Sequence, residues 1–183
     1  PSFSNITWER LQTESAVTYP CDAPDEPGHD VIFGDGFPTA SGRGKFVPAS
    51  IIPPDEMPDD EYPMVLTTGR QLEHWHTGAM TRRASVLDQL EPEAVGHMAP
   101  AELAYMGLEP GDDIAVATRR GTILVKARAD SGVPKGVIFV PFCYAESPAN
   151  MLTNPALDPV GKIPEFKFCG ARVERATAPS EPR

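Results

Sequence analysis

The hydrophobic and polar positions divide the chain into two parts with different patterns. Residues 1–61 show little periodicity, and only residues 6–11 are spaced for a short helix. From residue 62 onward, short apolar or β-branched runs alternate with turns. These runs predict strands at 63–68, 95–98, 113–118, 122–129, 136–141 and 171–174. Two short helices are expected at 80–90 and 100–106.

Many short strands with few helices favour a compact, mainly β-barrel domain over a doubly wound sheet. We therefore predict an extended acidic lead-in arm at residues 1–61 and a barrel domain at residues 62–183. Residues 142–168 lack periodicity and contain four prolines, so they are predicted to form a long irregular loop. Residues 176–183 are expected to fray.

Charge and cysteine content exclude several classes of protein. The 183 residues carry a formal net charge of −10, and residues 1–61 hold twelve acids against three bases, which argues against a nucleic-acid partner. No run of eighteen apolar residues is present, so membrane insertion is not expected. Three widely spaced cysteines rule out a disulfide framework and favour a reducing, cytoplasmic compartment.

The first residues also bear on what kind of chain this is. The chain starts at Pro1 rather than at methionine, and it shows no basic segment followed by an apolar stretch, so no secretory signal is recognised. We expect the chain to be a fragment or a processed product of a longer protein.

The first group of candidate functional residues follows the strand predicted at 63–68. A strand that runs into a glycine-containing loop and then a helix start exposes backbone N–H groups that can bind an anion. Arginine side chains nearby add paired donors that match phosphate oxygens. The alternative is a polar loop whose arginines pair with surface acids. The group consists of Thr68, Gly69, Arg70, His74, His76, Thr77, Arg82 and Arg83.

The pair His74 and His76 also suggests a metal site, because in an extended segment both rings face the same side. No Asp, Glu, His or Cys stands at a supporting spacing nearby. We therefore expect these histidines to hydrogen-bond to a ligand or to their own loop, and we predict no metal ligand in the chain.

The second group lies in the proline-rich stretch at 142–168. Asn150 can donate and accept hydrogen bonds at the edge of a heterocycle, and Lys167 can meet a phosphate or a ring carbonyl. A plain surface loop is the competing interpretation. Cys143 is expected to be a small buried residue rather than a nucleophile. No catalytic triad, Walker loop or carboxylate pair is present, so no catalytic residue is assigned.

Three stretches together resemble a known family: YPMVLTTGRQLEHWHTGAMTRR, HMAPAELAYMGLEPGDDIAVATRRGTILVKARA and KGVIFVPFCYAESPANMLTNPALDPVGKIPEFKFCGARVE. They are similar to the C-terminal molybdopterin dinucleotide-binding domain of the molybdenum and tungsten oxidoreductases, and most similar to the large subunit of formate dehydrogenase. The segments WERLQTESAVTYPC and FPTASGRGKFVP resemble the part that leads into this domain.

The resemblance implies a double-psi β-barrel that binds bis-molybdopterin guanine dinucleotide carrying molybdenum or tungsten. It implies that Thr68, Gly69, Arg70, His74, His76 and Thr77 line this cofactor, and that Tyr144, Asn150, Phe166 and Lys167 hold it from the opposite side. The metal's protein ligand and the iron–sulfur clusters are expected in upstream domains of the same catalytic subunit, with electron-transfer subunits as further partners. The segment alone is not expected to oxidise formate.

Two other interpretations stay open on the sequence. One is the same domain in a molybdoenzyme of the nitrate reductase type. The other is a stand-alone double-psi barrel that binds and scaffolds without catalysing a reaction.

Overall fold

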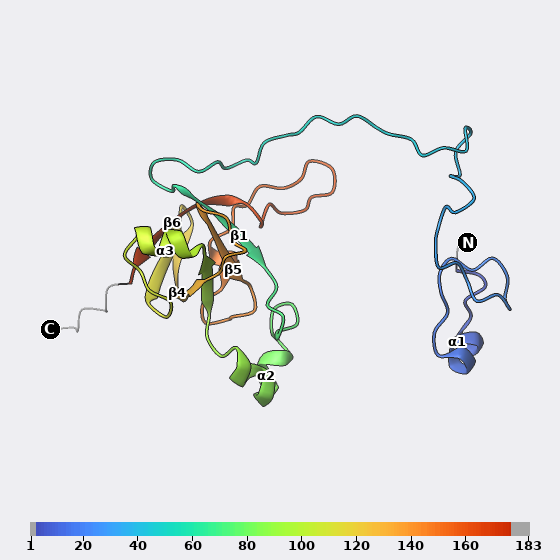
Figure 1. Ribbon diagram of the computed structural model, residues 1–183, viewed down its shortest axis with the longest axis horizontal. Helices are drawn as coiled ribbons and strands as arrows, with labels where there is room; N and C mark the ends of the chain where they lie inside the picture. Colours follow the sequence, from blue (N-terminus) through green and yellow to red (C-terminus); the bar gives the residue numbers. More distant parts are fainter. Residues whose placement is uncertain (1–2, 177–183) are drawn as a thin grey trace. The chain divides into compact units, whose positions relative to one another are not determined.

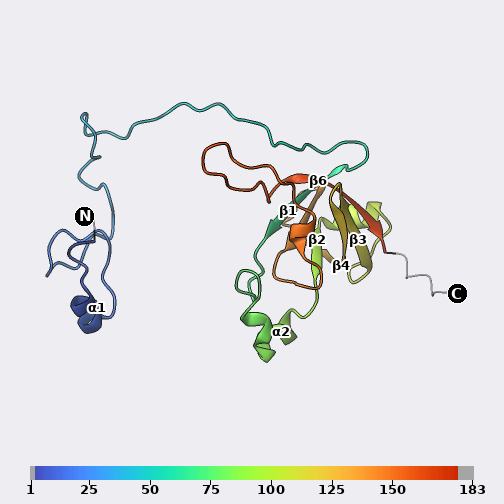
Figure 2. The same ribbon diagram turned by 180° about the vertical axis from the view of Figure 1, so that it is seen from behind.

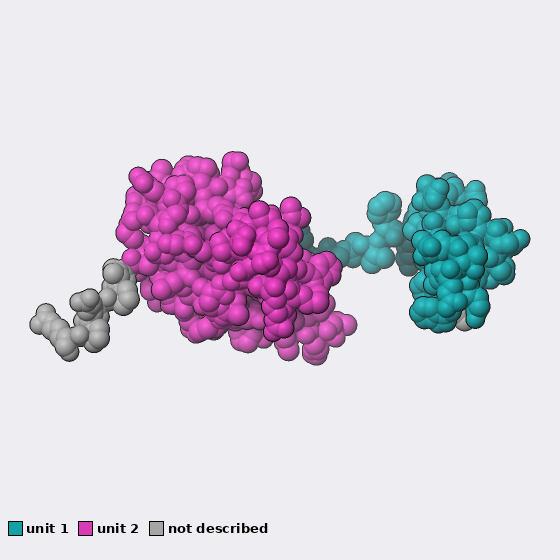
Figure 3. Space-filling model, turned by 90° about the horizontal axis from the view of Figure 1, so that it is seen from below, with its two compact units in different colours: residues 1–51 teal, residues 52–183 magenta. Residues whose placement is uncertain are grey.

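The computed structural model describes residues 3–176, which fall into two compact units (Figure 3). The units comprise residues 1–51 and residues 52–183. No helix among the described residues is long and apolar enough to cross a membrane. The fraying expected at 176–183 falls, apart from its first residue, outside the described part of the chain.

The first unit contains one helix, α1 (Trp8–Glu14), among otherwise irregular described segments (Figure 1). Thr7 caps this helix, since its hydroxyl accepts a hydrogen bond from the Arg10 N–H at 3.2 Å. The Arg10 guanidinium in turn donates to the carbonyl oxygens of Ala23 and Glu26 and so anchors the loop that follows. The short helix expected at 6–11 is confirmed, although it begins and ends later.

The second unit is a closed six-stranded barrel in the order β1-β5-β2-β4-β3-β6. This confirms the mainly β, barrel-type fold with a few short helices. The alternation of buried and accessible positions in the sequence produces these strands because every second side chain faces the barrel interior. The strands are β1 (Met64–Gly69), β2 (Val95–Met98), β3 (Asp113–Thr118), β4 (Gly121–Ala129), β5 (Val137–Pro141) and β6 (Cys169–Arg175).

Two strand pairs of the barrel are parallel, and a long stretch of chain connects the two strands of each pair, as parallel pairing requires. β1 pairs with β5 in the register Leu66 to Ile138, and β2 pairs with β4 in the register Gly96 to Ala127. The other neighbours are antiparallel. Leu66, Ile114 and Ile138 are at most 1% exposed and form part of the core that fills the barrel.

The short helices lie outside the barrel wall. α3 (Pro100–Tyr105) has proline in its first turn and is followed by Gly107 at φ +67°, as the sequence predicts. The single helix expected at 80–90 is wrong: the structure has a 3₁₀ turn at Thr81–Arg83 and then α2 (Ser85–Leu90). The break occurs because Ala84 is extended, with φ −91° and ψ 106°, and serves as the N-cap of α2.

The long connection between β5 and β6 contains a 3₁₀ turn at Ala149–Met151 and then leaves the barrel as a hairpin-like loop (orange in Figure 2). The bridge between Leu157 and Pro164 closes this loop. The stretch is otherwise irregular, in agreement with the loop expected at 142–168.

The barrel unit begins at residue 52, ten residues before the expected start of the domain at residue 62. The reason is a set of ion pairs that bind residues 52–62 to the barrel. Glu56 accepts hydrogen bonds from the Arg120 guanidinium (Nη2 to Oε1, 3.1 Å) and from the Gly170 N–H (2.9 Å). Asp59 pairs with Arg119, which also lies 3.2 Å from Glu56. The division into an arm at residues 1–61 and a barrel domain at residues 62–183 stays a prediction.

Candidate functional site

The two predicted groups of functional residues lie in segments that meet the barrel at the same end. β1 and β5 are parallel, with Gly69 beside Pro141, so the loops that follow them both start there. β6 is antiparallel to β1, and Cys169 pairs with Leu66, so the residues just before β6 reach this end as well. The topology therefore brings together residues about 80 positions apart in the sequence.

Two neighbouring hollows lie between these loops and share Thr77. The first, of about 420 Å³, combines two aromatic rings with amide and hydroxyl groups, and its lining is Thr77, Phe142, Asn150, Thr153, Pro164 and Phe166. The second, of about 310 Å³, is more polar and includes two arginines, and its lining is Thr77, Gly78, Ala79, Arg82, Arg83, Cys143, Ala145 and Glu146. Apolar walls with a few polar groups are typical of ligand sites.

Gly78 permits the close approach of the two loops that form these hollows. Its φ is +73°, and a Cβ atom at this position would lie 2.6 Å from the Cys143 carbonyl oxygen and 2.7 Å from Cγ of Arg82. Both the backbone conformation and the contact therefore require glycine.

Thr68 and Lys167 connect the end of β1 to the segment before β6. The Thr68 hydroxyl donates to the Phe166 carbonyl oxygen at 2.7 Å, and the Lys167 ammonium donates to the Thr68 carbonyl oxygen at 2.8 Å. Gly69 follows, and a Cβ atom there would lie 2.4 Å from the Phe139 ring. These three residues fix the local backbone, with the side chain of Phe166 lining the first hollow.

The two arginines of the second hollow differ in their contacts. The Arg82 side chain is held by Asp88 at 2.6 Å and Glu146 at 2.9 Å, and its guanidinium lies 4.8 Å from the centre of the Tyr144 ring. The Arg83 guanidinium makes no hydrogen bond or ion pair with any other described residue, and only the backbone N–H of Arg83 is bonded, to the Met80 carbonyl oxygen at 3.0 Å. Asn150 likewise has no partner for its side-chain amide within the described part of the chain. Arg83 and Asn150 thus have free hydrogen-bonding groups at the hollows.

His74 and Tyr144 lie behind the surface of the site. Each is 1% exposed, and each has its polar atoms in hydrogen bonds to other residues of the chain. Burial raises the pKa of the Tyr144 hydroxyl above its ordinary value. The sequence placed both side chains against the ligand, but the structure gives neither a free polar atom facing the hollows.

Arg70 lines a different groove, and His76 lies beside its guanidinium. The Arg70 guanidinium lies 3.5 Å from Nε2 of the exposed His76. Arg70 lines a groove of about 530 Å³ on the outer face of the barrel, together with Phe139 and His97. The structure therefore does not bring Arg70 into the hollow that contains Asn150. Arg70 and Lys167 were expected on opposite sides of one ligand, and the Lys167 ammonium instead lies at the carbonyl oxygen of Thr68.

His97 of β2 is paired with an aspartate from the loop after β4. Its Nδ1 lies 3.1 Å from Oδ2 of Asp130. Burial lowers the pKa of His97, and this effect exceeds the opposite effect of the hydrogen bond that the ring donates to Asp130. This contact could not be predicted from local sequence pattern, because the two residues are 33 positions apart.

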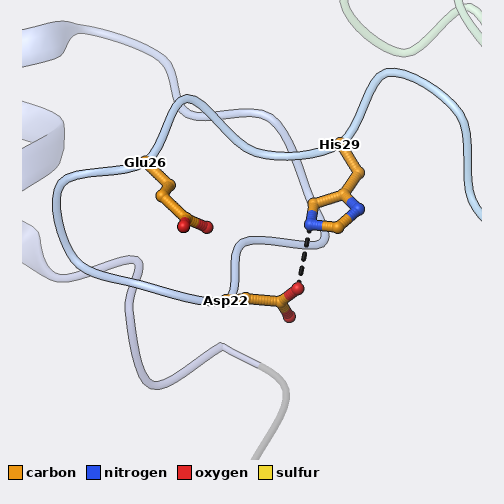
Figure 4. A group of neighbouring side chains, drawn as sticks. All are labelled: Asp22, Glu26 and His29. Carbon is orange, nitrogen blue, oxygen red and sulfur yellow. Dashed lines mark ion pairs between the residues drawn. The ribbon is translucent and has the colours of Figure 1, made fainter.

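Cys143 lines the second hollow, and one group of possible metal ligands occurs elsewhere in the sequence of the described residues. Cys143 is buried, and burial raises the pKa of its thiol to about 11, so it is a poor nucleophile at neutral pH. Among residues 3–176, one group of three metal-ligating side chains occurs, Asp22, Glu26 and His29 (Figure 4). All three are exposed, and His29 forms an ion pair with Asp22 at 2.9 Å. Exposed groups of this kind are common without a bound ion.

Residues 64–170 match the family model described as the molydopterin dinucleotide binding domain. This match covers more than half of the chain. The chain belongs to this family. The residues matched include both loops that form the hollows, so the dinucleotide-binding domain is the part of the molecule in which the predicted site lies.

Curated relatives give a more specific likeness. The dinucleotide-binding chain is 40% identical over 175 residues to the F420-dependent formate dehydrogenase 1 subunit alpha of Methanococcus maripaludis. It is also 40% identical over 175 residues to the F420-dependent formate dehydrogenase subunit alpha of Methanocaldococcus jannaschii. Each alignment covers 96% of this chain and 26% of the relative. The chain therefore spans about a quarter of the length of these relatives.

A solved structure supports the fold. Acetylene hydratase from Pelobacter acetylenicus matches with a TM-score of 0.58 over 63% of this chain and 19% of that chain, at 22% sequence identity. At this identity the match establishes the likeness of fold.

The lining of the hollows fits a pterin dinucleotide. Phe142 and Phe166 offer apolar ring surface beside a flat heterocycle, and the free amide of Asn150 can pair with its edge. The free guanidinium of Arg83 suits a phosphate. The sequence missed Phe142, Thr153 and Pro164 as lining residues. These three residues lie in the same irregular stretch as Asn150, and this position was the only indication in the sequence that they could line the site.

Proposed function

We propose that this chain is the part of a formate dehydrogenase catalytic subunit that binds bis-molybdopterin guanine dinucleotide. The observation behind the proposal is the pair of hollows that share Thr77. The free Asn150 amide lines one hollow with the rings of Phe142 and Phe166, and the free Arg83 guanidinium lines the other. The family match at residues 64–170 and the formate dehydrogenase relatives support it.

In this proposal the Arg83 guanidinium forks onto a phosphate of the dinucleotide, and the Asn150 amide pairs with a heterocycle edge. Thr77 contributes its hydroxyl where the two hollows meet. Thr68, Gly69 and Lys167 hold the backbone that presents Phe166. When bound, the cofactor supplies the molybdenum or tungsten at which formate is oxidised to carbon dioxide with release of two electrons.

Arg70 and His76 take a second role in the proposal. The two side chains lie together and are exposed, and Arg70 lines a separate groove, so they are available to a part of the cofactor that extends beyond the hollows. The length of a dinucleotide makes contact with more than one surface region reasonable.

We further propose that upstream domains of the same subunit supply the metal's protein ligand and the iron–sulfur clusters. That this chain spans 26% of its relatives supports such domains. Electron-transfer subunits are proposed as additional partners. A cytoplasmic location is proposed because Cys21, Cys143 and Cys169 are all free, as expected in a reducing compartment.

The test uses the intact catalytic subunit with Arg83→Ala and Asn150→Ala. Loss of a charged hydrogen bond costs ~1.5–3 kcal/mol, so Arg83→Ala is expected to weaken retention of the cofactor by roughly ten- to a hundredfold. Guanine nucleotide and metal per polypeptide are measured beside the rate of formate oxidation. Both contents should fall, while the rate per bound metal changes much less.

Arg175→Ala is the matched control. Arg175 is an exposed arginine in an ion pair with Asp112 at 2.8 Å, outside the lining of both hollows. This variant should retain wild-type nucleotide content. Full occupancy in both Arg83→Ala and Asn150→Ala would contradict the proposed site, and an intact subunit without guanine nucleotide would contradict the proposed function.

A further inference from the structure

We propose that His74 and Tyr144 are positioning residues, which couple the two loops of the site through one shared acceptor, the backbone carbonyl oxygen of Glu91. This inference rests on the proposed function, because it assigns how the cofactor site keeps its shape. It differs from the expectation that these two side chains touch the cofactor.

The shared acceptor is defined by two hydrogen bonds. His74, in the loop after β1, places Nε2 2.8 Å from the Glu91 carbonyl oxygen. Tyr144, in the loop after β5, donates its hydroxyl to the same oxygen at 3.2 Å. The two rings also meet edge to face, with centres 5.8 Å apart and planes at 82°. One atom of residue 91 thus joins loops that carry opposite walls of the hollows.

These bonds define the tautomer of the neutral His74 ring. A carbonyl oxygen only accepts, so Nε2 must carry the proton that is donated to Glu91. Nδ1 then accepts from the hydroxyl of Thr81, 3.3 Å away, and that hydroxyl oxygen accepts the Trp75 N–H at 3.0 Å. The loop from residue 74 to residue 81 is thereby closed on itself and tied to Glu91.

Glu91 is itself held firmly, so it can serve as an anchor. Its carboxylate receives two hydrogen bonds from Arg128 of β4, at 3.0 and 2.8 Å. Its N–H donates to the Leu87 carbonyl oxygen at the end of α2. A bidentate arginine pair gives a defined geometry as well as energy. The anchor therefore connects both loops to the barrel wall.

The consequence is a coupling that simple packing does not give. Both loops are bonded to the same carbonyl oxygen of Glu91. Removing the donor of one loop therefore loosens the other loop as well as the loop that carried the donor. Arg83 and Thr77 belong to the first loop, and Asn150 belongs to the second, so both walls of the site lose definition together.

The experiment uses the intact holoenzyme with three variants. Tyr144→Phe removes only the hydroxyl, His74→Leu removes both ring nitrogens, and His74→Gln restores a donor near the position of Nε2. Hydrogen–deuterium exchange is measured in the segments 71–83 and 142–154, together with the rate at which guanine nucleotide is released. Tyr105→Phe is the control, because Tyr105 is 82% exposed on α3.

We expect Tyr144→Phe and His74→Leu each to speed exchange in both segments, and to speed nucleotide release roughly two- to tenfold, the factor for one neutral hydrogen bond. His74→Gln should recover most of the wild-type release rate. The double variant should fall short of the product of the single effects, because both act on one acceptor.

Three results would overturn the inference: faster exchange confined to the substituted loop, unchanged release in spite of faster exchange, or His74→Gln behaving like His74→Leu. A wild-type holoenzyme that contains no guanine nucleotide would instead contradict the proposed function, on which the inference depends. In that case the exchange data still report whether Glu91 couples the loops.

Discussion

Replacement of Glu56 by glutamine tests how the segment at 52–62 is held on the barrel. The Glu56 carboxylate is 16% exposed and accepts hydrogen bonds from Arg120 and from the Gly170 N–H, and Arg119 lies 3.2 Å away. Glutamine keeps the size of the side chain but removes the charge that pairs with Arg119 and Arg120. The expected result is a less stable barrel unit.

The magnitude follows from the contacts. A hydrogen bond to a charged group contributes ~1.5–3 kcal/mol, and glutamine retains part of the bonding to Arg120, so we expect a loss of about 2 kcal/mol. Urea unfolding of the chain, followed by circular dichroism, measures this loss. With a slope of about 2 kcal/mol per molar urea, the midpoint should fall by roughly 1 M.

The pH dependence gives an independent check on the same carboxylate. Burial alone would raise the pKa of Glu56, but the hydrogen bonds from Arg120 and Gly170 and the arginine charges together lower it. A carboxyl group whose pKa is lower in the folded state stabilises the fold fully above its unfolded pKa of about 4.3. This stabilisation is lost as the pH falls through the folded-state pKa.

The difference in stability between the wild type and Glu56→Gln should therefore be largest at pH 7 and shrink toward acid pH. Glu61→Gln is the matched control, because Glu61 is an exposed residue of the same segment whose carboxylate has no partner among the described residues. A Glu56→Gln midpoint equal to that of Glu61→Gln at pH 7, or a difference that grows toward acid pH, would show that the Glu56 charge does not hold this segment on the barrel.

Two further predictions concern single substitutions, at Gly78 and at Asp130. Gly78→Ala forces a Cβ atom against Cys143 and Arg82 at positive φ, so it should destabilise the chain by about 1–3 kcal/mol. Gly107→Ala, also at positive φ but with no atom within 4 Å, should cost less in the same urea assay, and equal losses would contradict the close contact. Asp130→Asn should lower the pKa of His97 further, because the Asp130 carboxylate is what raises it against burial. An NMR titration of the His97 ring checks this, and a pKa that rises would be the contrary result.

The sequence predicted the barrel well because its strands depend on local pattern. In β3 and β4 the alternation of buried and accessible residues fixes which side of each strand faces inward, and the turn between them is short. The 3₁₀ turn before α2 was not predicted, because the extended conformation of Ala84 is set by its surroundings and not by its own preference.

The site was predicted in part. Glycine, proline and arginine mark both loops in the sequence, and the resemblance to the family implied that they hold one ligand from opposite sides. In the structure both loops start at the same end of the barrel. The roles of single residues depend on contacts between distant positions, such as Tyr144 with Glu91 and Lys167 with Thr68. His74 illustrates the limit: a histidine in a polar loop has the same appearance in sequence whether it faces a ligand or is 1% exposed inside the protein.

The most direct test of the central claim is an experimental structure of the intact catalytic subunit purified with its cofactor. We expect a molybdopterin guanine dinucleotide in the hollows around Thr77, with a phosphate at Arg83 and a heterocycle edge at Asn150. A dinucleotide bound to the protein with these two side chains away from it would contradict the claim.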